Sequence, residues 1–266
     1  MVTKYVNIRL ILFVIFFLNS FTSEIFSYPG NDGKKIETII LDAGHGGKDP
    51  GTTGLSGEYE KNIVLSIVKK VRNLLESENS DIKVVLTRDK DEFIELKDRG
   101  VIANENEGNL FVSIHCNAKK SEENDKSGFE IYLLDLVRLP EAFKITLLEN
   151  KIFDFINILT DTSFRKFILT SLLQNSFIRN SERFSSIVQY ELSTGSKLES
   201  RGIMEAGYYV LLGASMPSIL IECGYLSNKN DEEYLKSETG QNEIAKSIYK
   251  AIRLYKLEYD FENMNY

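Results

Sequence analysis

Hydrophobic and polar residues alternate along this chain in two periods, one typical of strands and the other of helices. Short apolar runs rich in β-branched side chains predict buried strands at residues 37–41, 83–87, 109–114, 128–134, 208–212 and 218–221. Apolar positions at helical spacing predict helices over residues 60–77, 92–105 and 241–257. This alternation of strands and helices favours an α/β fold with a mostly parallel sheet.

One stretch, residues 136–195, interrupts the alternation. It holds only helix-like apolar pieces, at residues 143–159, 164–177 and 184–192. A connection of this length inside a compact domain is commonly functional or separately ordered. Two interpretations remain open: an extra helix packed on the sheet, or a lid or regulatory helix over a functional site.

The first 27 residues have the layout of a secretory signal peptide. Lys4 and Arg9 precede a continuous apolar run at residues 10–18, and small and polar residues follow as far as Ser27. The run is shorter than the ~20 residues of a usual membrane span. We therefore expect an exported protein, with an uncleaved N-terminal anchor as the alternative.

Composition narrows the class of protein further. The chain has 266 residues, a net charge of −7, two cysteines and two histidines. An acidic chain argues against a nucleic-acid partner, because neutralising phosphates needs a basic face. The length allows one core large enough to need no disulfide or metal for its stability.

Both histidines follow predicted strands. His45 lies in a glycine-rich loop after the first strand, and His115 ends the strand at 109–114. Ligands of open α/β sheets bind at the carboxyl ends of strands, so the two imidazoles could converge on one ion. A catalytic zinc takes three protein ligands, and either Glu60 or Glu58 could be the third.

A further carboxylate, Glu222, ends the apolar strand at 218–221. A buried carboxylate is costly without partners, so it needs either a salt bridge or a chemical role. Beside a metal-bound water, it would serve as a general base.

Several motifs together resemble one family, the zinc-dependent N-acetylmuramoyl-L-alanine amidases called Amidase_3. The resemblance spans most of residues 37–257. It rests on ILDAGHGGKDPG (40–51), EKNIVL (60–65), VVLTRDKDEFIEL (84–96), RGVIANE (99–105), NLFVSIHCNA (109–118), RGIMEAGYYVLLGASMPSILIECGYLSN (201–228) and QNEIAKSIYKAI (241–252).

The resemblance implies a fold, a reaction and a set of site residues. The fold would be a six-stranded sheet flanked by helices. The reaction would be hydrolysis of the amide that joins N-acetylmuramic acid to L-alanine of the peptidoglycan stem peptide. The implied residues are His45, Glu60 and His115 as ligands of one Zn²⁺ per chain, Glu222 as the catalytic glutamate, and Arg201 as a residue near the site. Arg201 would pair with a carboxylate of the substrate or of the protein, and an exposed structural ion pair is the alternative. Asn117 is a further candidate to contact the substrate or to support the site.

Two cysteines depart from the family pattern. Cys116 follows the third implied ligand, and Cys223 follows Glu222. Neighbouring residues of a strand point to opposite faces, so both thiols should point away from the metal. We favour buried, free thiols, and a disulfide between them is the alternative.

The 136–195 stretch also resembles an insert of some cell-division amidases, in which a helix blocks the site until a protein activator binds. Such a helix would offer a carboxylate to the metal, and Glu149 and Glu141 are the candidates. The alternative is that both glutamates lie on a solvated helix face.

These inferences predict a signal peptide at 1–27, a catalytic domain at 35–257 that includes the insert, and a tail at 258–266. We expect a monomeric enzyme of the periplasm or cell envelope that acts on peptidoglycan in wall remodelling or daughter-cell separation. One alternative is a wall-binding or surface-interaction protein of the same fold with little turnover. Another is a zinc amidohydrolase acting on some other extracellular amide.

Overall fold

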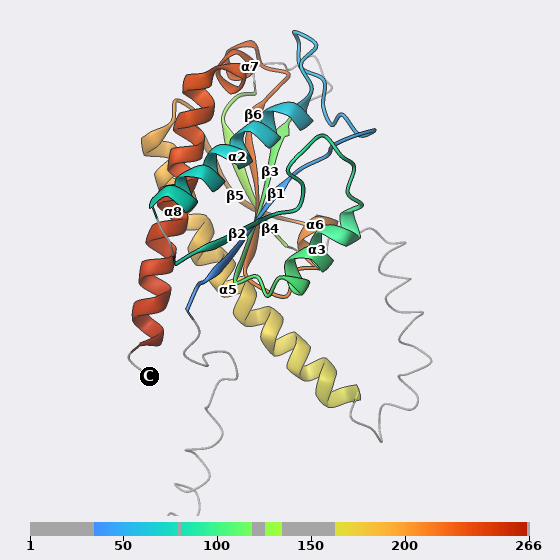
Figure 1. The fold of residues 1–266 in the computed structure, drawn as a ribbon, viewed down its shortest axis with the longest axis vertical. Coiled ribbons are helices and arrows are strands. Elements are labelled where there is room, and N and C mark those ends of the chain that lie inside the picture. Colours follow the sequence, from blue (N-terminus) through green and yellow to red (C-terminus); the bar gives the residue numbers. More distant parts are fainter. Residues whose placement is uncertain (1–34, 79–80, 119–125, 135–162, 265–266) are drawn as a thin grey trace, which may run out of the picture.

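The computed structural model describes residues 35–78, 81–118, 126–134 and 163–264 of the chain. Within them lies a six-stranded sheet with the strand order β2-β1-β3-β6-β4-β5 (Figure 1). The strands are β1 (Thr38–Ala43), β2 (Lys83–Leu86), β3 (Leu110–Asn117), β4 (Phe129–Leu134), β5 (Ser200–Ala206) and β6 (Ser218–Tyr225). The predicted α/β class is confirmed.

The sheet is divided into two sets of parallel strands. Strands β2, β1, β3 and β6 run in one direction, whereas β4 and β5 run together in the other. The carboxyl ends of β1, β3 and β6 therefore lie at the same edge of the sheet as the amino-terminal ends of β4 and β5. This edge brings together residues from distant parts of the sequence.

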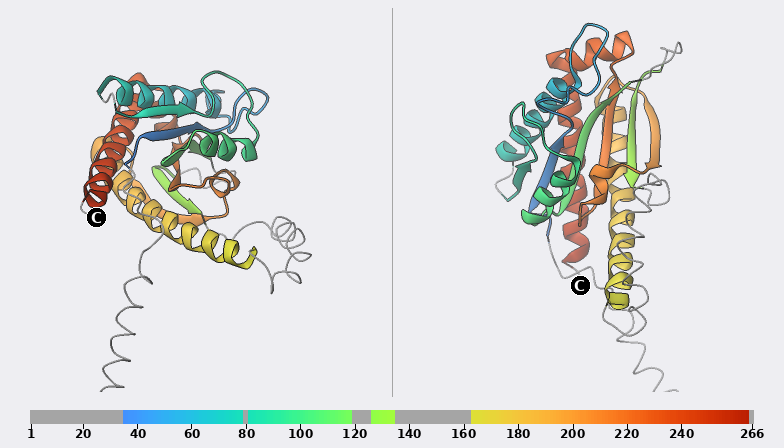
Figure 2. Two further views of the ribbon diagram at one scale, coloured as in Figure 1. Left: turned by 60° about the horizontal axis from the view of Figure 1, so that its bottom comes forward. Right: turned by 90° about the vertical axis from the view of Figure 1, so that its right-hand side faces the viewer.

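Helices cover both faces of the sheet (Figure 2). The helices are α2 (Glu60–Glu78), α3 (Leu96–Glu105), α5 (Ser163–Gly195), α6 (Tyr209–Leu212), α7 (Lys229–Lys236) and α8 (Glu238–Asn263). Buried apolar residues of α2, α5, α7 and α8 pack with one face of the strands, and residues of α3 and α6 pack with the other. Among the described residues, no helix is both long and apolar enough to cross a membrane.

The larger core explains why the long helices form where they do. Ile244, Ile248 and Ile252 recur at helical spacing along α8 and are fully buried. Phe184, Val188 and Leu192 form a matching stripe on α5, and α5 packs directly against α8. The C-terminal part of α5 is therefore a helix packed on the sheet, which is one of the two interpretations of the 136–195 stretch.

One predicted element was wrong, and one element was missed. The predicted strand at 208–212 is the short helix α6, whose Val210 and Leu211 pack against the smaller core. Such a short apolar run does not distinguish a strand from a helix. Strand β5 was missed because it is a largely polar edge strand interrupted by Gly202, whose φ is +108°.

Several boundaries also differ from the prediction. Helix α3 begins at Leu96, four residues later than expected, because residues 92–95 form a loop whose Ile94 carbonyl accepts from Arg99. Strands β3 and β6 continue beyond 114 and 221 to Asn117 and Tyr225, and α8 runs from Glu238 to Asn263. The extra residues of β3 and β6 place His115 and Glu222 within strands.

Candidate metal centre and neighbouring carboxylates

The first candidate ligand, His45, lies in the loop that leaves the carboxyl end of β1. Its backbone φ is +59°, a left-handed conformation that non-glycine residues adopt rarely and often at functional sites. Gly44, just before it, donates from its backbone N–H to the carbonyl of Ile114 at 3.1 Å. This contact ties the loop to β3, the strand that carries the other histidine.

Glu60, the first residue of α2, is held in place by backbone donors. Its Oε1 accepts from the N–H of Cys116 at 2.9 Å, and its Oε2 accepts from the N–H of Thr52 at 2.9 Å. Only 2% of the residue is exposed. A carboxylate at a helix N-terminus is also stabilised by the helix dipole. Glu60 therefore has one fixed orientation, aimed at the two histidines.

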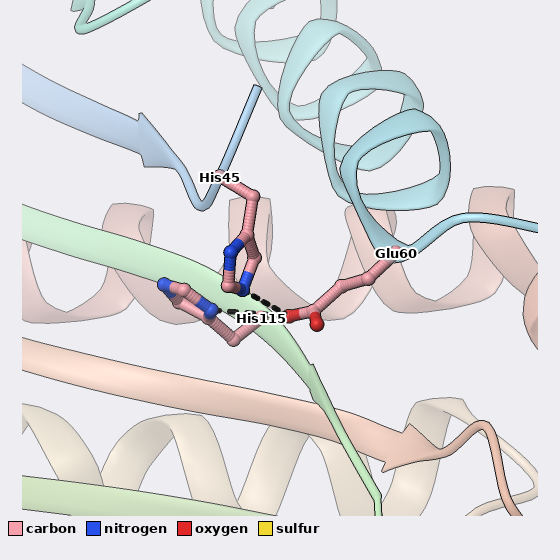
Figure 3. A group of neighbouring side chains, drawn as sticks. All are labelled: His45, Glu60 and His115. Atoms are coloured by element: carbon pink, nitrogen blue, oxygen red, sulfur yellow. Dashed lines mark hydrogen bonds and ion pairs between the residues drawn. The ribbon is translucent and has the colours of Figure 1, made fainter. Parts of the chain in front are cut away.

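His45, Glu60 and His115 converge at this edge of the sheet (Figure 3). Glu60 Oε1 lies 3.2 Å from His45 Nε2 and 3.1 Å from His115 Nδ1. One potential ligand atom from each residue lies within 4.8 Å of the others. Glu58, the alternative third ligand, instead accepts from Asn62 and from the N–H of Tyr59.

This donor set fits a catalytic zinc ion. Two imidazole nitrogens and one carboxylate oxygen are ligands that zinc uses while keeping a position open for water. The other ring nitrogen of His45, Nδ1, lies 2.8 Å from Asp49 Oδ2, a contact that presents Nε2 to the site. A Cβ on Gly44 would lie within 2.6 Å of three ring atoms of His115, so only glycine fits there.

The charges of the site favour a cation. Burial alone lowers the pKa of an imidazole, yet the hydrogen bonds and charges of Glu60 and Asp49 raise the pKa of His45 to about 9. Burial alone raises the pKa of a carboxyl, but hydrogen bonds to His115 and His45 hold the pKa of Glu60 well below its ordinary value. The three side chains thus form a site whose field attracts positive charge.

Glu222 lies beside this group on β6. It is paired in parallel register with His115, so the two side chains project from the same face of the sheet. The residue is 8% exposed, and its Oε2 is buried with no hydrogen-bond partner among the described residues. Burial, with the charges of Glu60 and Glu130 adding to it, raises the pKa of Glu222 to about 7. A group with such a pKa can accept a proton near neutral pH.

Arg201 and Asn117, expected near the substrate or behind the site, meet at a residue that sequence reasoning missed. Both contact Glu130 of β4, with Asn117 Nδ2 donating at 2.7 Å and Arg201 Nε at 3.3 Å from its carboxylate. Only the alternation of β4, with Glu130 amid apolar neighbours, could have identified it.

Two buried arginines, also missed, hold the backbone of the His45 loop. Arg99 donates to the carbonyls of Ala43 and His45 and to the carboxylate of Asp42. Arg88 donates to the carbonyls of Ala43 and Gly44. Their positions in the motif at 84–96 and at the start of 99–105 marked them as part of the resemblance, without a role.

The remaining expectations divide in two groups. Cys116 and Cys223 are free, buried members of the larger core on the opposite face from Glu222, as we favoured. Glu141, Glu149 and the segment 1–27 lie outside the described residues, so their predicted roles stay predictions.

Comparison with known proteins yields one family and related structures. The model of the Amidase_3 family, described as N-acetylmuramoyl-L-alanine amidase, matches residues 39–254. The chain is 34% identical to N-acetylmuramoyl-L-alanine amidase AmiC of Escherichia coli over 231 residues. These cover 85% of the chain and 55% of the relative, so the chain spans just over half the length of that protein.

Two solved structures show the same fold. The N-acetylmuramoyl-L-alanine amidase of Clostridium difficile 630 superposes with a TM-score of 0.64 at 30% identity, over 84% of this chain and 97% of that one. The CwlD amidase of Clostridioides difficile, solved in complex with the GerS lipoprotein, has a TM-score of 0.61 at 30% identity. The match covers 82% of this chain and 98% of CwlD.

Proposed function

The chain belongs to the Amidase_3 family of N-acetylmuramoyl-L-alanine amidases, and we propose that it hydrolyses peptidoglycan with the aid of one bound zinc ion. The bond cleaved is the amide between the lactyl group of N-acetylmuramic acid and L-alanine of the stem peptide. The observation that carries the proposal is the convergence of His45, Glu60 and His115 beside the unpartnered carboxylate of Glu222.

Each residue has a defined task in this reaction. His45, Glu60 and His115 would hold the zinc ion, and Asp49 orients the His45 ring through its Nδ1. A zinc ion held there would supply Lewis-acid chemistry, which polarises an amide carbonyl and lowers the pKa of a bound water molecule.

Glu222 acts as general base and then as general acid. Its carboxylate accepts a proton as the water oxygen adds to the carbonyl carbon. It then gives that proton to the amine nitrogen of L-alanine as the carbon–nitrogen bond breaks. The products are the lactyl carboxylate and a stem peptide with a free amino terminus, so no covalent enzyme intermediate is required.

The cellular setting follows from the substrate. Peptidoglycan lies outside the cytoplasmic membrane, so we infer export, by the signal peptide at 1–27 or with it as an anchor, to the periplasm or cell envelope. Similarity to AmiC and to an amidase solved with a lipoprotein supports a role in wall remodelling or daughter-cell separation. The amidase solved with a lipoprotein supports a protein partner for this chain, and we propose that such a partner acts on the 136–195 insert.

The test is hydrolysis of purified peptidoglycan, read by mass spectrometry of released stem peptides with an N-terminal L-alanine. Four samples are compared: the native chain, a chelated sample, a zinc-restored sample and the Glu222→Ala variant. We expect release only where both zinc and Glu222 are present. Binding to peptidoglycan without release would favour the wall-binding alternative, and release of another amide product would favour the broader amidohydrolase.

A further inference from the structure

A second carboxylate, Glu130, continues the candidate site across the sheet. His115 of β3 is paired with Glu222 of β6, and Glu222 is paired with Glu130 of β4. Residues directly opposite each other on neighbouring strands project from the same face. The three side chains therefore form a row, with Glu130 on the side of Glu222 away from the metal ligands.

Glu130 is the centre of a hydrogen-bonded cluster drawn from four adjacent strands. Only 5% of the residue is exposed. Its carboxylate accepts from Asn117 Nδ2 at 2.7 Å, Tyr132 Oη at 2.8 Å and Tyr225 Oη at 2.6 Å, and lies 3.3 Å from Arg201 Nε. Asn117, Tyr225 and Arg201 lie at the edge of the sheet that carries the metal ligands, and Tyr132 lies two residues further along β4 than Glu130.

Stability alone does not explain why a carboxylate is buried in this cluster. Burying a carboxylate is costly, and a buried ion pair is often no more stable than apolar residues of the same volume. The cluster does fix the geometry of its donors, because each side chain that donates to Glu130 has one defined orientation. Glu130 thus acts on the site through the residues that it holds.

Arg201 is the most exposed member of the cluster. Its side chain is 35% exposed, its Nη1 lies 3.4 Å from the carbonyl of Ser127, and its guanidinium carbon lies 5.9 Å from the centre of the Tyr225 ring. Glu130 and Tyr225 thus hold one edge and one face of the guanidinium. A planar guanidinium fixed in this way pairs well with a carboxylate.

We propose that Glu130 is a positioning residue that holds Arg201 beside the candidate catalytic glutamate, where the guanidinium binds a carboxylate of the peptide part of the substrate. The inference rests on the proposed function for the identity of that substrate. It adds recognition of an anionic group, which the metal ligands and Glu222, being imidazoles and carboxylates, do not supply. A cation in this row also offsets the repulsion between those carboxylates and an anionic peptide.

Binding can be measured apart from cleavage. The full chain carrying Glu222→Gln is loaded with zinc and titrated calorimetrically with a soluble N-acetylmuramoyl peptide. The peptide is offered in two forms, one with free carboxylates and the other with those carboxylates converted to amides. Three further variants are made in the same background: Arg201→Gln, Glu130→Gln and the double variant.

We expect Arg201→Gln to weaken binding of the free-carboxylate peptide by roughly 10- to 100-fold and to abolish discrimination against the amidated form. Glu130→Gln should reduce the same discrimination. Because Glu130 acts through Arg201, the double variant should bind no more weakly than Arg201→Gln alone. Glu199→Gln, an exposed glutamate just before β5, is the matched control and should bind normally.

Three results would overturn the proposal. They are unchanged discrimination in Arg201→Gln, additive losses in the double variant, and a Glu130→Gln variant that is less stable yet binds with full discrimination. If Glu130→Gln does not fold, Tyr225→Phe removes one donor while keeping the ring, and discrimination must fall there instead. Discriminating binding in a chain that never hydrolyses peptidoglycan would contradict the proposed function, not the role of Arg201.

Discussion

Glu222 and Glu130 are paired directly across the antiparallel strands β6 and β4, yet their carboxylates have opposite surroundings. Both oxygens of Glu130 accept hydrogen bonds, whereas Oε2 of Glu222 is buried without a partner among the described residues. The donors around Glu130 fix the position of its carboxylate, whereas the desolvated carboxylate of Glu222 binds protons more readily. The pair therefore separates a positioning role from a proton-transfer role.

The activity should decline in acid as Glu222 is protonated. Desolvation raises the pKa of Glu222 from 4.5 to about 7, and a bound zinc cation would lower it again. A general base works only when deprotonated, so kcat/KM should decrease as the pH drops, with its inflection between these two values. A pH profile of stem-peptide release measures it. An inflection at or below the ordinary value of 4.5 would contradict the assignment.

Removing the base should abolish turnover without removing the metal. We expect Glu222→Gln to lower kcat by roughly 100- to 10,000-fold, because the amide cannot accept the proton of the attacking water. Zinc content, measured by metal analysis, should stay at one ion per chain. The exposed Glu105→Gln is the control. A Glu222→Gln variant that retains full activity would assign the base elsewhere.

The fold was largely predictable because its strands and helices are strongly patterned. The α2 stripe and the apolar runs of β1, β3 and β6 are local signals that the core reinforces. The predictions failed at strand β5 and helix α6 because these segments are short or polar, and only tertiary packing determines their secondary structure.

The candidate site was predictable where its residues lie at the carboxyl ends of predicted strands. His45, His115 and Glu222 lie at such ends, and the chain has only two histidines. Glu60 was chosen over Glu58 only through the family resemblance. Glu130 has no such signal, because β4 is antiparallel to β6 and brings its beginning, not its end, to the site. The direction of a strand depends on chain connections that local sequence does not encode.

The orientation of His45 should control zinc affinity. Asp49 Oδ2 lies 2.8 Å from Nδ1 of that ring, and Asp49 Oδ1 accepts from the N–H of Gly51. We expect Asp49→Asn to weaken zinc binding by roughly 10- to 100-fold, because the ring loses its charged partner. Competition with a chelator of known affinity measures the change.

Asp89→Asn, at an exposed position, serves as control for this measurement and should leave zinc affinity unchanged. Equal affinities for Asp49→Asn and the native chain would show that the loop backbone alone orients His45. Orientation by the backbone is the main alternative to orientation by Asp49, because the left-handed φ of His45 already restricts the position of its ring.

The buried carboxylate of Asp42, behind the His45 loop, should contribute strongly to the free energy of unfolding. Asp42 is fully buried, accepts from Thr87 and Ser113 at 2.6 Å each, and pairs with Arg99 at 2.7 Å. Asp42→Asn leaves Arg99 buried without its counter-charge, and we expect a loss of about 3 kcal/mol in the free energy of unfolding near neutral pH. Thr87→Val, which removes a single donor, should cost about 1 kcal/mol.

The pH dependence of this loss identifies its cause. Burial opposes ionisation, but Arg99 and the two hydroxyls hold the folded-state pKa of Asp42 below 3.8. A lowered folded pKa contributes stability that is complete above the unfolded pKa and disappears as the pH falls through the folded pKa. The difference between the native chain and Asp42→Asn should therefore be constant above about pH 5 and shrink in acid. Denaturant unfolding at several pH values measures it, and a difference that does not change with pH would mean that packing, not charge, is lost.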